Sequence, residues 1–506
     1  MRSRNGQASV PYLWILSETR ASGSRSDHGR IMNRQTVDQA KYRLGRGNPK
    51  TTVVKGRRPF GKYQRALHYL LEKANYESKL PAHYDARTCG LARIRALLSR
   101  VGNPQKKLRT VHITGTKGKG STATMLARML EADSYSVGLY TSPHVEDLRE
   151  RLSVNNKMIG KRQLVDLLNR IYPPLQKLAR ADELTFFDIM TTLAFLHFAD
   201  SQVDLAVIET GFGGGLDSTN VLTPEVVGIT SLSLDHQHLL GPTIELIAAE
   251  KAGVFKPGVP VVTVNQNPKA MDVLQSRAVA LDAPLSVVGR DIHYSYRYET
   301  SRDEGPHGRI CLTTETSEFQ HLRVPLHGEH QAKNCALALA ILDKLKERGF
   351  AIDDEKASQG LSSVELPGRM EMIGNKPRVL IDGAHNAASI RALIRAVALY
   401  IPADSVVMVF GCNRDKDIEG MLNELQYGAD KVIFTGSDNP WSECPYDLMK
   451  RYSEKCGKMC QVAGNLEQAL MMAQSGIGQE DLICITGSFY LIGAARTRFD
   501  RHQTLP

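Results

Sequence analysis

The sequence predicts a two-domain α/β protein in which helices cover parallel sheets. Strand-like apolar runs alternate with helix-like segments, and this alternation is typical of parallel strands joined by crossover helices. A glycine-rich turn separates the first strand from its helix. A second alternating set begins after Leu366-Pro367-Gly368, which we interpret as a hinge. We therefore expect a larger domain with a parallel central sheet over residues 63–365 and a smaller doubly wound domain over residues 366–506.

Periodicity and turn residues predict the individual elements. In the larger domain we expect helices over 63–74, 91–100, 123–130, 161–178 and 186–199, strands from Val111 and over 135–140 and 205–208, and short β-like stretches within 286–326. Thr185 and Asp188 form a capping pair that predicts the start of one helix. In the smaller domain we expect strands over 378–381, 405–410, 431–434 and 482–485 and helices over 388–400 and 466–473.

Composition indicates a globular protein with a basic N-terminal extension. The chain has 506 residues, 42% of them hydrophobic, and no apolar run approaches the roughly 20 residues of a membrane helix. The net charge is +10, but residues 1–62 contain 14 basic and three acidic residues, which leaves the remainder near neutral. We expect this extension to be disordered. The eight cysteines lack CxxC spacing, which predicts neither disulfides nor a zinc site and favours a cytoplasmic protein.

The turn Gly115-Thr116-Lys117-Gly118-Lys119-Gly120-Ser121 has the features of a phosphate-binding loop. It connects an apolar strand to a helix, so consecutive backbone N–H groups and the positive end of the helix face one anion. Lys119 adds a mobile positive charge. Only two residues separate Gly115 from Gly118-Lys119, where the common phosphate loop has four. Because strand, lysine, hydroxyl and helix coincide, we predict a nucleoside triphosphate site.

A carboxylate ends the strand that begins at Leu205. Glu209 follows this apolar run, and the glycines after it allow a ligand to approach closely. In phosphate-loop folds an acid at this place holds the Mg²⁺ that accompanies the triphosphate, so Glu209 is predicted as a metal ligand. Asp235-His236 and Glu250-Lys251 also contain titratable residues, but their types alone do not distinguish a site from ordinary buried or solvated side chains.

Several motifs occur in the order seen in the Mur ligase superfamily. They are the glycine-rich turn, Thr141-Ser142-Pro143-His144, Glu209-Thr210-Gly211, Asp217-Ser218-Thr219-Asn220, Asp235-His236, Glu250-Lys251-Ala252-Gly253 and Asp382-Gly383-Ala384-His385-Asn386. The first two, with Pro367-Gly368-Arg369-Met370-Glu371, resemble the folate branch of that superfamily, the folylpolyglutamate and dihydrofolate synthases. The resemblance covers about residues 63–496. It implies a Mur ligase-like α/β fold with a P-loop N-terminal ATPase domain and a Rossmann-like C-terminal domain.

The resemblance implies an ATP-dependent ligase. Such an enzyme transfers the γ-phosphoryl group of ATP to a folate-type carboxylate, from tetrahydrofolate or dihydropteroate, and the amine of L-glutamate then attacks the acyl phosphate. The expected cofactors are ATP and two Mg²⁺ ions, and the motifs leave open whether a monovalent cation takes part. We expect these small molecules as the only partners, without nucleic acid or membrane, and a monomeric enzyme.

The resemblance also assigns roles within the larger domain. Lys119 contacts the β- and γ-phosphates, and Ser142 and Glu209 hold one Mg²⁺. Glu209 and His236 hold the second. Lys251 carries a carbamate that supports the second metal, since carbamylation converts a cation into an anionic oxygen ligand. These residues form the expected catalytic and metal-binding set.

Further roles fall on residues near and beyond the hinge. The resemblance places Asn334, Arg369 and Asp382 around the nucleotide, and His385, which follows on the loop of Asp382, is a further expected catalytic residue. An arginine pairs well with phosphate, which suits the hinge position of Arg369. From adjacency we infer that Asp235 orients the histidine that follows it.

Two positions depart from the family pattern. Gly215 and Trp441 stand where an Arg is expected. The loss of two cations affects the expected contacts to substrate carboxylates and leaves the expected ATP and metal ligands unchanged.

Two alternatives share parts of this pattern. A Mur ligase of cell-wall synthesis has the same ATP machinery, but it usually reads Lys-Thr-Thr or Lys-Thr-Ser where this chain has Lys119-Gly120-Ser121. Residues 1–62 are also too short and polar for its separate UDP-sugar domain. The second alternative is a nucleic-acid-binding NTPase, which the basic extension and the phosphate loop suggest.

Removing residues 1–62 distinguishes this second alternative from a ligase. A ligase should keep its turnover, because the expected site lies in the near-neutral remainder of the chain. A nucleic-acid-binding NTPase should lose its salt-sensitive affinity together with the extension. The measurement is ATP turnover and nucleic-acid binding at two salt concentrations, and a loss of turnover on truncation contradicts the ligase interpretation.

Overall fold

The computed structural model describes residues 59–72, 90–178, 184–301, 305–437 and 439–501. Contacts divide the chain into Met1–Arg57 and Arg58–Pro506, and every described residue lies in the second unit. Residues 1–58 of the extension lie outside the described residues, so the expected disorder stays a prediction. The boundary expected between residues 365 and 366 falls inside the second unit and also stays a prediction.

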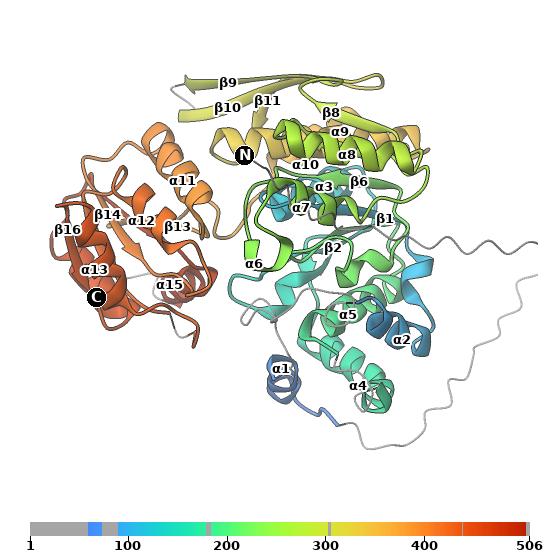
Figure 1. Ribbon diagram of the computed structural model, residues 1–506, viewed down its shortest axis with the longest axis horizontal. Coiled ribbons are helices and arrows are strands. Elements are labelled where there is room, and N and C mark those ends of the chain that lie inside the picture. The colour runs from blue at the N-terminus through green and yellow to red at the C-terminus, as the bar shows by residue number, and fades with distance from the viewer. Residues whose placement is uncertain (1–58, 73–89, 179–183, 302–304, 438, 502–506) are drawn as a thin grey trace, which may run out of the picture. The chain divides into compact units, whose positions relative to one another are not determined.

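The larger sheet has the expected α/β architecture (Figure 1). Its eight strands lie in the order β4-β3-β2-β5-β1-β6-β7-β8. The six strands β2, β5, β1, β6, β7 and β8 pair in parallel with their neighbours in this series. β3 and β4 add an antiparallel edge that the sequence pattern does not predict. The strands span Thr110–Thr114 (β1), Val137–Tyr140 (β2), Leu152–Val154 (β3), Lys157–Met158 (β4), Leu205–Glu209 (β5), Val226–Ile229 (β6), Val261–Val264 (β7) and Leu285–Val288 (β8).

Apolar residues on both faces of this sheet explain why helices cover both faces. Along β5, Ala206 and Ile208 belong to one core, and Leu205 and Val207 belong to another, because neighbouring side chains in a strand alternate. The first core contains α1, α2, α4 and α5, and the second contains α3 and α9. These helices span Tyr63–Leu71 (α1), Ala92–Arg100 (α2), Lys119–Ala132 (α3), Lys161–Leu178 (α4), Phe186–Asp200 (α5) and Glu329–Glu347 (α9).

Helix α9 is buried, and the sequence pattern does not predict it. It contacts strands of the large sheet on one side and the antiparallel strands β9 to β11 on the other (Figure 1). A helix that is covered on several sides lacks the single apolar stripe that periodicity detects. The three strands agree with the β-like pattern expected within 286–326. They span His293–Ser301 (β9), Gly305–Thr313 (β10) and Glu318–Val324 (β11), and the other helices here are Gln237–Leu240 (α6), Ile244–Ala252 (α7), Pro268–Ala280 (α8) and Asp354–Ser362 (α10).

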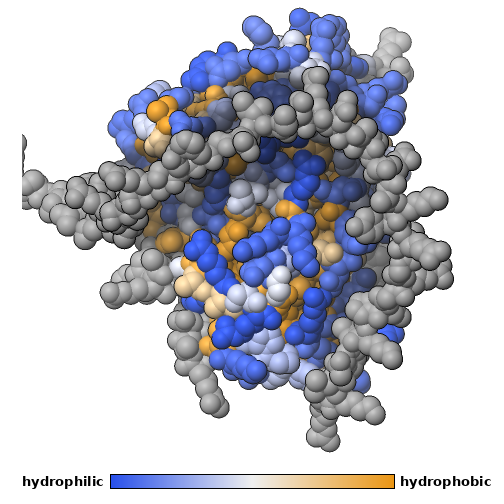
Figure 2. Space-filling view, turned by 90° about the vertical axis from the view of Figure 1, so that its right-hand side faces the viewer, coloured by the Kyte–Doolittle hydropathy of each residue, from blue (hydrophilic) through white to orange (hydrophobic). Residues whose placement is uncertain are grey.

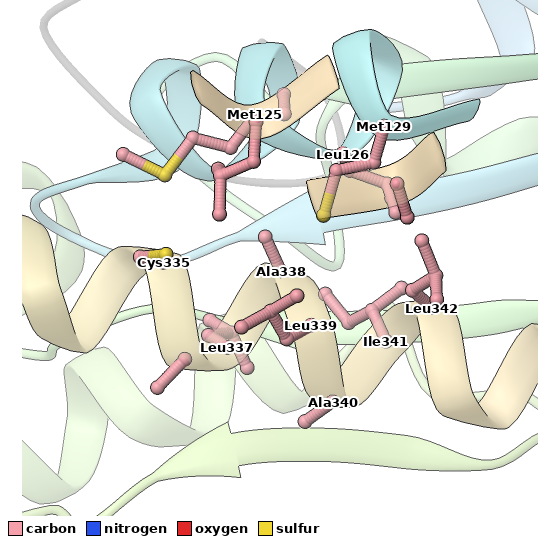
Figure 3. Close-up of a cluster of buried hydrophobic side chains, with 14 of the residues drawn as sticks. Met125, Leu126, Met129, Cys335, Leu337, Ala338, Leu339, Ala340, Ile341 and Leu342 are labelled. Carbon is pink, nitrogen blue, oxygen red and sulfur yellow. The ribbon is translucent and has the colours of Figure 1, made fainter. Parts of the chain in front are cut away.

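The contact between α3 and α9 anchors the helix that leaves the glycine-rich turn. Met125, Leu126 and Met129 of α3 face α9, where Ala338 and Leu342 pack toward them (Figure 3). All five side chains are fully buried. Because α3 begins at the turn, this core fixes the direction in which the N-terminal end of the helix points.

The smaller domain has its own six-stranded sheet, which contains the four strands expected there and two further strands at its edges. The strand order is β12-β13-β17-β14-β15-β16, and all neighbours are parallel except β12 and β13. The strands span Glu371–Asn375 (β12), Arg378–Asp382 (β13), Val406–Phe410 (β14), Lys431–Phe434 (β15), Met459–Val462 (β16) and Leu482–Thr486 (β17). The helices span Ala387–Tyr400 (α11), Ile418–Leu425 (α12), Pro445–Lys455 (α13), Leu466–Gln474 (α14) and Phe489–Arg501 (α15).

Packing in the described part of the chain begins before α1. Phe60 is buried, and its ring lies 5.1 Å from Tyr69 and 5.2 Å from Tyr172. Its backbone exchanges two hydrogen bonds with the side chain of Asn169. A truncation that tests the basic extension should therefore retain Phe60 and remove residues 1–57 only.

The described surface is mixed in character. Hydrophilic residues surround the apolar ones on the face drawn in Figure 2. Among the described residues, no helix is both long enough and apolar enough to cross a membrane.

We expect the α3–α9 contact to contribute strongly to stability. Replacing Leu342 with Ala removes a fully buried side chain and should lower the free energy of unfolding by about 2–5 kcal/mol. The matched control is Leu71→Ala, because Leu71 also lies in a helix but is 53% exposed. Urea unfolding of both variants measures the difference, and equal destabilisation contradicts the expected role of the core.

Candidate active site

The loop between β1 and α3 requires glycine at two positions. Gly115 and Gly118 have φ values of 142° and 90°, a region that other residues rarely adopt. A Cβ atom at Gly118 would also overlap the Oδ1 atom of Asn334 on α9. The backbone can therefore turn sharply into α3, whose first residue is Lys119. The result is a loop with the N-terminal end of a 14-residue helix behind it, which suits an anionic ligand.

A carboxylate that is largely shielded from solvent, Asp235, holds this loop from the side. The backbone N–H groups of Thr116 and Lys117 donate to the carbonyl of Ser231, at 3.1 and 3.2 Å. The Lys117 ammonium donates to Asp235 Oδ2 at 2.7 Å, and Asn386 Nδ2 donates to the same oxygen at 3.1 Å. Burial alone would raise the pKa of Asp235, but the charge and hydrogen bond of Lys117, together with the nearby His236 and His385, outweigh it and hold this pKa far below its usual range. Asp235 thus remains an anion that joins three loops.

Glu209 lies beside the glycine-rich loop, at the carboxyl end of β5. Its register partner on β1 is Ile113, so the ends of the two strands are adjacent. The side chain is only 3% exposed, and Oε2 accepts the backbone N–H of Ser142 at 2.9 Å. A Cβ atom at Gly120 would lie 3.3 Å from that oxygen. The predicted acid, the phosphate loop and Ser142 therefore meet in one place.

Lys251 is a buried lysine in the last turn of α7. Its ammonium donates to the carbonyls of Phe212 and Gly213, the second at 3.1 Å. Burial lowers the pKa of Lys251 to about 7, and the positive charge of Lys119 adds to this effect. A substantial fraction of this amine is therefore neutral near pH 7, which is the form that reacts with electrophiles.

Two histidines in the site are neutral. Burial lowers the pKa of His236 to about 3, and its ring centre lies 5.3 Å from that of Phe212. Its backbone N–H donates to Asp235 Oδ1 at 2.9 Å. Burial also lowers the pKa of His385 well below its usual value, and the Nε2 atom lies 3.5 Å from Lys117 Nζ. Neutral imidazoles keep a lone pair for hydrogen bonds or metal ions.

Arg369 comes to the site from the hinge. Its guanidinium lies 4.7 Å from the centre of the Phe489 ring and donates to the carbonyl of Gly368 at 3.2 Å. Asp382 accepts the backbone N–H groups of Met370 and Ala384, at 3.0 and 2.9 Å. Asp382 therefore fixes the backbone beside Arg369.

Most of the predicted residues line one cavity of about 280 Å³. Those that do are Gly115, Thr116, Lys117, Gly118, Lys119, Gly120, Ser121, Ser142, Glu209, His236, Lys251, Arg369 and His385. Among the described lining residues, Asn334 and Asp382 do not occur, but Asn334 packs against the lining residue Gly118, and Asp382 bonds the backbone of Met370 and Ala384, which flank the lining residues Arg369 and His385. Gly215 and Trp441 are also absent from this lining, so the two departures from the family pattern lie outside the cavity wall.

Several lining residues were missed by sequence reasoning. Arg151 belongs to a Glu150-Arg151 pair that is usual for the family, but the sequence gave it no role; it is buried and donates to His144 Nδ1 at 2.9 Å. Phe187 lies in the first turn of α5, directly after the cap formed by Thr185, and the predicted capping box there is confirmed. Lys416 lies in the loop between β14 and α12. The rule that sites form at the carboxyl ends of parallel strands could have found Lys416.

Family models place the chain among the Mur ligases. Residues 113–342 match the Mur ligase middle domain, and residues 368–489 match the glutamate ligase domain of Mur ligases. The class is therefore that of Mur-type ligases, in agreement with the fold and with the resemblance of the motifs.

Individual relatives narrow this class. The chain is 35% identical to the dihydrofolate synthase/folylpolyglutamate synthase of Bacillus subtilis, over 81% of this chain and 94% of the relative. A Mycobacterium tuberculosis folylpolyglutamate synthase complexed with ADP has a TM-score of 0.79 and 32% identity, over 86% of this chain and 98% of that one. A folylpolyglutamate synthase complex with AMPPCP and folate has a TM-score of 0.74 and 30% identity, over 86% and 99%. The chain belongs to the folylpolyglutamate synthase/dihydrofolate synthase family.

The environment of Lys251 makes it a sensitive position. Lys251→Ala removes the amine that contacts two carbonyls of the glycine-rich segment after β5, and ATP-dependent turnover should fall by about 100-fold. Added bicarbonate should not restore it, because alanine has no amine to carbamylate. The control is Lys269→Ala, since Lys269 is exposed on α8. Normal turnover of the Lys251→Ala enzyme would contradict the expected catalytic role of Lys251.

Proposed function

We propose that this chain catalyses the ATP-dependent formation of an amide bond between L-glutamate and a folate-type carboxylate. The observation that carries the proposal is the convergence of the phosphate loop, Glu209, Lys251 and Arg369 on one cavity. Membership in the family, and the relatives solved with ADP or with AMPPCP and folate, support it. The cell-wall ligase has no comparable support, because the named relatives are folate enzymes.

The phosphate end of ATP belongs, in this proposal, to the larger domain. Residues of the loop and of the first turn of α3 line the cavity, with the N-terminal end of the helix behind the loop, and Lys119 supplies the charge for the β- and γ-phosphates. Lys117 is paired with Asp235 and holds the loop in shape. Arg369 approaches from the hinge, and His385 is a second candidate contact to the transferred phosphoryl group.

The residues present fit Mg²⁺. Glu209 supplies a buried carboxylate beside the loop, and His236 is neutral and open to coordination. In the described ranges no three His, Cys, Asp or Glu side chains cluster as a metal cage. Mg²⁺ commonly takes one or two protein carboxylates and completes its shell with water and phosphate oxygens, which agrees with this arrangement. Ser142 and Glu209 would hold one ion, and Glu209, His236 and a carbamate on Lys251 would hold a second.

When bound, the metal ions neutralise charge on the transferring phosphoryl group. The chain itself has to align the substrate carboxylate with the γ-phosphorus and keep water away from the acyl phosphate. The Phe187, Phe212 and Leu240 side chains give the cavity apolar walls that serve this purpose. The glutamate amine then attacks the activated carbonyl, the amide bond forms and phosphate leaves.

We infer that both dihydropteroate and tetrahydrofolate are substrates. The relatives from Bacillus subtilis and Mycobacterium tuberculosis, at 35% and 34% identity, carry the names of both activities. Their match extends over 81% of this chain in each case, so the inference draws on the whole site and not on the phosphate loop alone.

Product mass tests the proposal directly. ATP, Mg²⁺ and L-glutamate are incubated with dihydropteroate or with tetrahydrofolate in separate reactions, each with and without added K⁺, and phosphate release is followed. Each pterin should gain the mass of one glutamate residue in step with phosphate release. A gain with one pterin alone restricts the substrate, and no gain with either overturns the folate assignment and makes UDP-muramyl substrates the next test.

A further inference from the structure

A seam of polar contacts joins the loop after Ser142 to helix α15 of the smaller domain. Glu146 pairs with Arg496, and Glu146 Oε1 accepts the Thr497 hydroxyl at 2.7 Å. Arg496 Nε also donates to Glu371 Oε1 at 2.8 Å. Residues far apart in the sequence thus share one guanidinium.

The backbones in this seam approach unusually closely. A Cβ atom at Gly493, one turn before Thr497 on α15, would overlap the carbonyl oxygen of Val145. A backbone atom cannot rotate away as a flexible side chain can. Only glycine at position 493 therefore permits the loop and the helix to lie as they do.

Each end of the seam is adjacent in sequence to residues that line the cavity. On one side, the loop residues Ser142 and Val145 line the cavity, directly before Glu146. On the other, Glu371 Oε2 accepts the backbone N–H of Gly368 at 2.6 Å, directly before Arg369, which also lines the cavity. One ion-pair network therefore spans from the loop to the hinge.

The loop that contains Glu146 is held rigid by its own hydrogen bonds, so a displacement at one of its residues reaches the others. The backbone N–H groups of Val145, Glu146 and Asp147 all donate to the carboxylate of Glu150, at 2.7–3.0 Å. A loop tied in this way moves as one piece, so a shift at Glu146 also shifts the cavity residues before it.

A second contact between the same two parts of the chain is independent of the seam. Tyr296 of β9 and Tyr400 of α11 share a hydrogen bond of 2.6 Å between their hydroxyls, and Tyr298 donates to the carbonyl of Leu399 at 2.7 Å. These tyrosines keep the parts joined at one side when the seam is broken, so its loss lets the domains open about this contact and changes the geometry of the cavity.

We propose that Glu146 and Gly493 are positioning residues for ligation, which hold the Ser142–Val145 side of the cavity against the Arg369 side. The inference rests on the proposed function of the cavity. Neither residue is among the described residues that line the cavity, and neither has a role in the phosphate or metal contacts above. Their effect is on where the two walls stand relative to each other.

Two variants break the seam by different physical means. Glu146→Gln removes the charge that Arg496 pairs with and keeps the shape of the side chain. Gly493→Ala adds one methyl group that the Val145 carbonyl excludes, although alanine favours a helix more than glycine does and should not weaken α15 itself. The matched control is Asp147→Asn, because Asp147 lies in the same loop but contacts Tyr63 and Arg149 of its own domain.

The readouts separate positioning from stability. We expect kcat/KM for the pterin substrate to fall about tenfold or more in both Glu146→Gln and Gly493→Ala. Their affinity for ADP should stay within twofold of wild type, and their melting temperature should be unchanged. Their radius of gyration, measured by small-angle scattering, should be larger. Asp147→Asn should match wild type. The proposal is overturned if both seam variants keep wild-type kcat/KM and scattering, or if their activity falls only in parallel with the melting temperature.

The design also separates this proposal from the proposed function. If the wild-type chain ligates neither pterin, the function fails, and the scattering of the same variants still decides whether the seam sets the position of the two walls. If wild type is active and the variants behave as wild type, the function stands and the positioning role is wrong.

Discussion

The site depends on one carboxylate, Asp235, whose side chain is only 13% exposed. It accepts the Lys117 ammonium, the backbone N–H of His236 and the side-chain amide of Asn386. A buried anion is costly unless it is paired and hydrogen-bonded, and here each partner belongs to a different functional segment. The phosphate loop, the proposed metal-binding histidine and the loop of His385 are therefore fixed relative to one another by the same requirement.

Burial adjusts the chemistry of the other titratable groups around this anion. It keeps His236 neutral and brings the pKa of Lys251 to about 7, whereas Glu209 lies between the phosphate loop and Ser142. These effects come from packing, since the same residue types on a surface would be charged or solvated. The cavity therefore combines two carboxyl groups, those of Asp235 and Glu209, with a lysine of lowered pKa and neutral imidazoles beside the glycine-rich loop.

The two domains contribute different structural features to the cavity. The larger domain supplies the glycine-rich loop, which the α3–α9 core orients, and the smaller domain supplies residues at the carboxyl ends of its strands. Contacts at the Glu146 seam and between Tyr296 and Tyr400 join them. The relative positions of the cavity residues therefore depend on how the two domains are joined.

The sequence alone determined the α/β class, the phosphate loop, Glu209 and the family, because glycine spacing, strand periodicity and ordered motifs are local signals. It did not reveal α9, whose burial on several sides removes the periodic stripe, nor Lys416, which belongs to no motif singled out from the sequence. It also gave Asn334 and Asp382 as nucleotide contacts, and these roles stay predictions. In the structure Asn334 packs against Gly118, and Asp382 accepts the backbone N–H groups of Met370 and Ala384. Only the tertiary structure decided which side chains share a cavity, because residues more than 100 positions apart meet there through packing that no local pattern records.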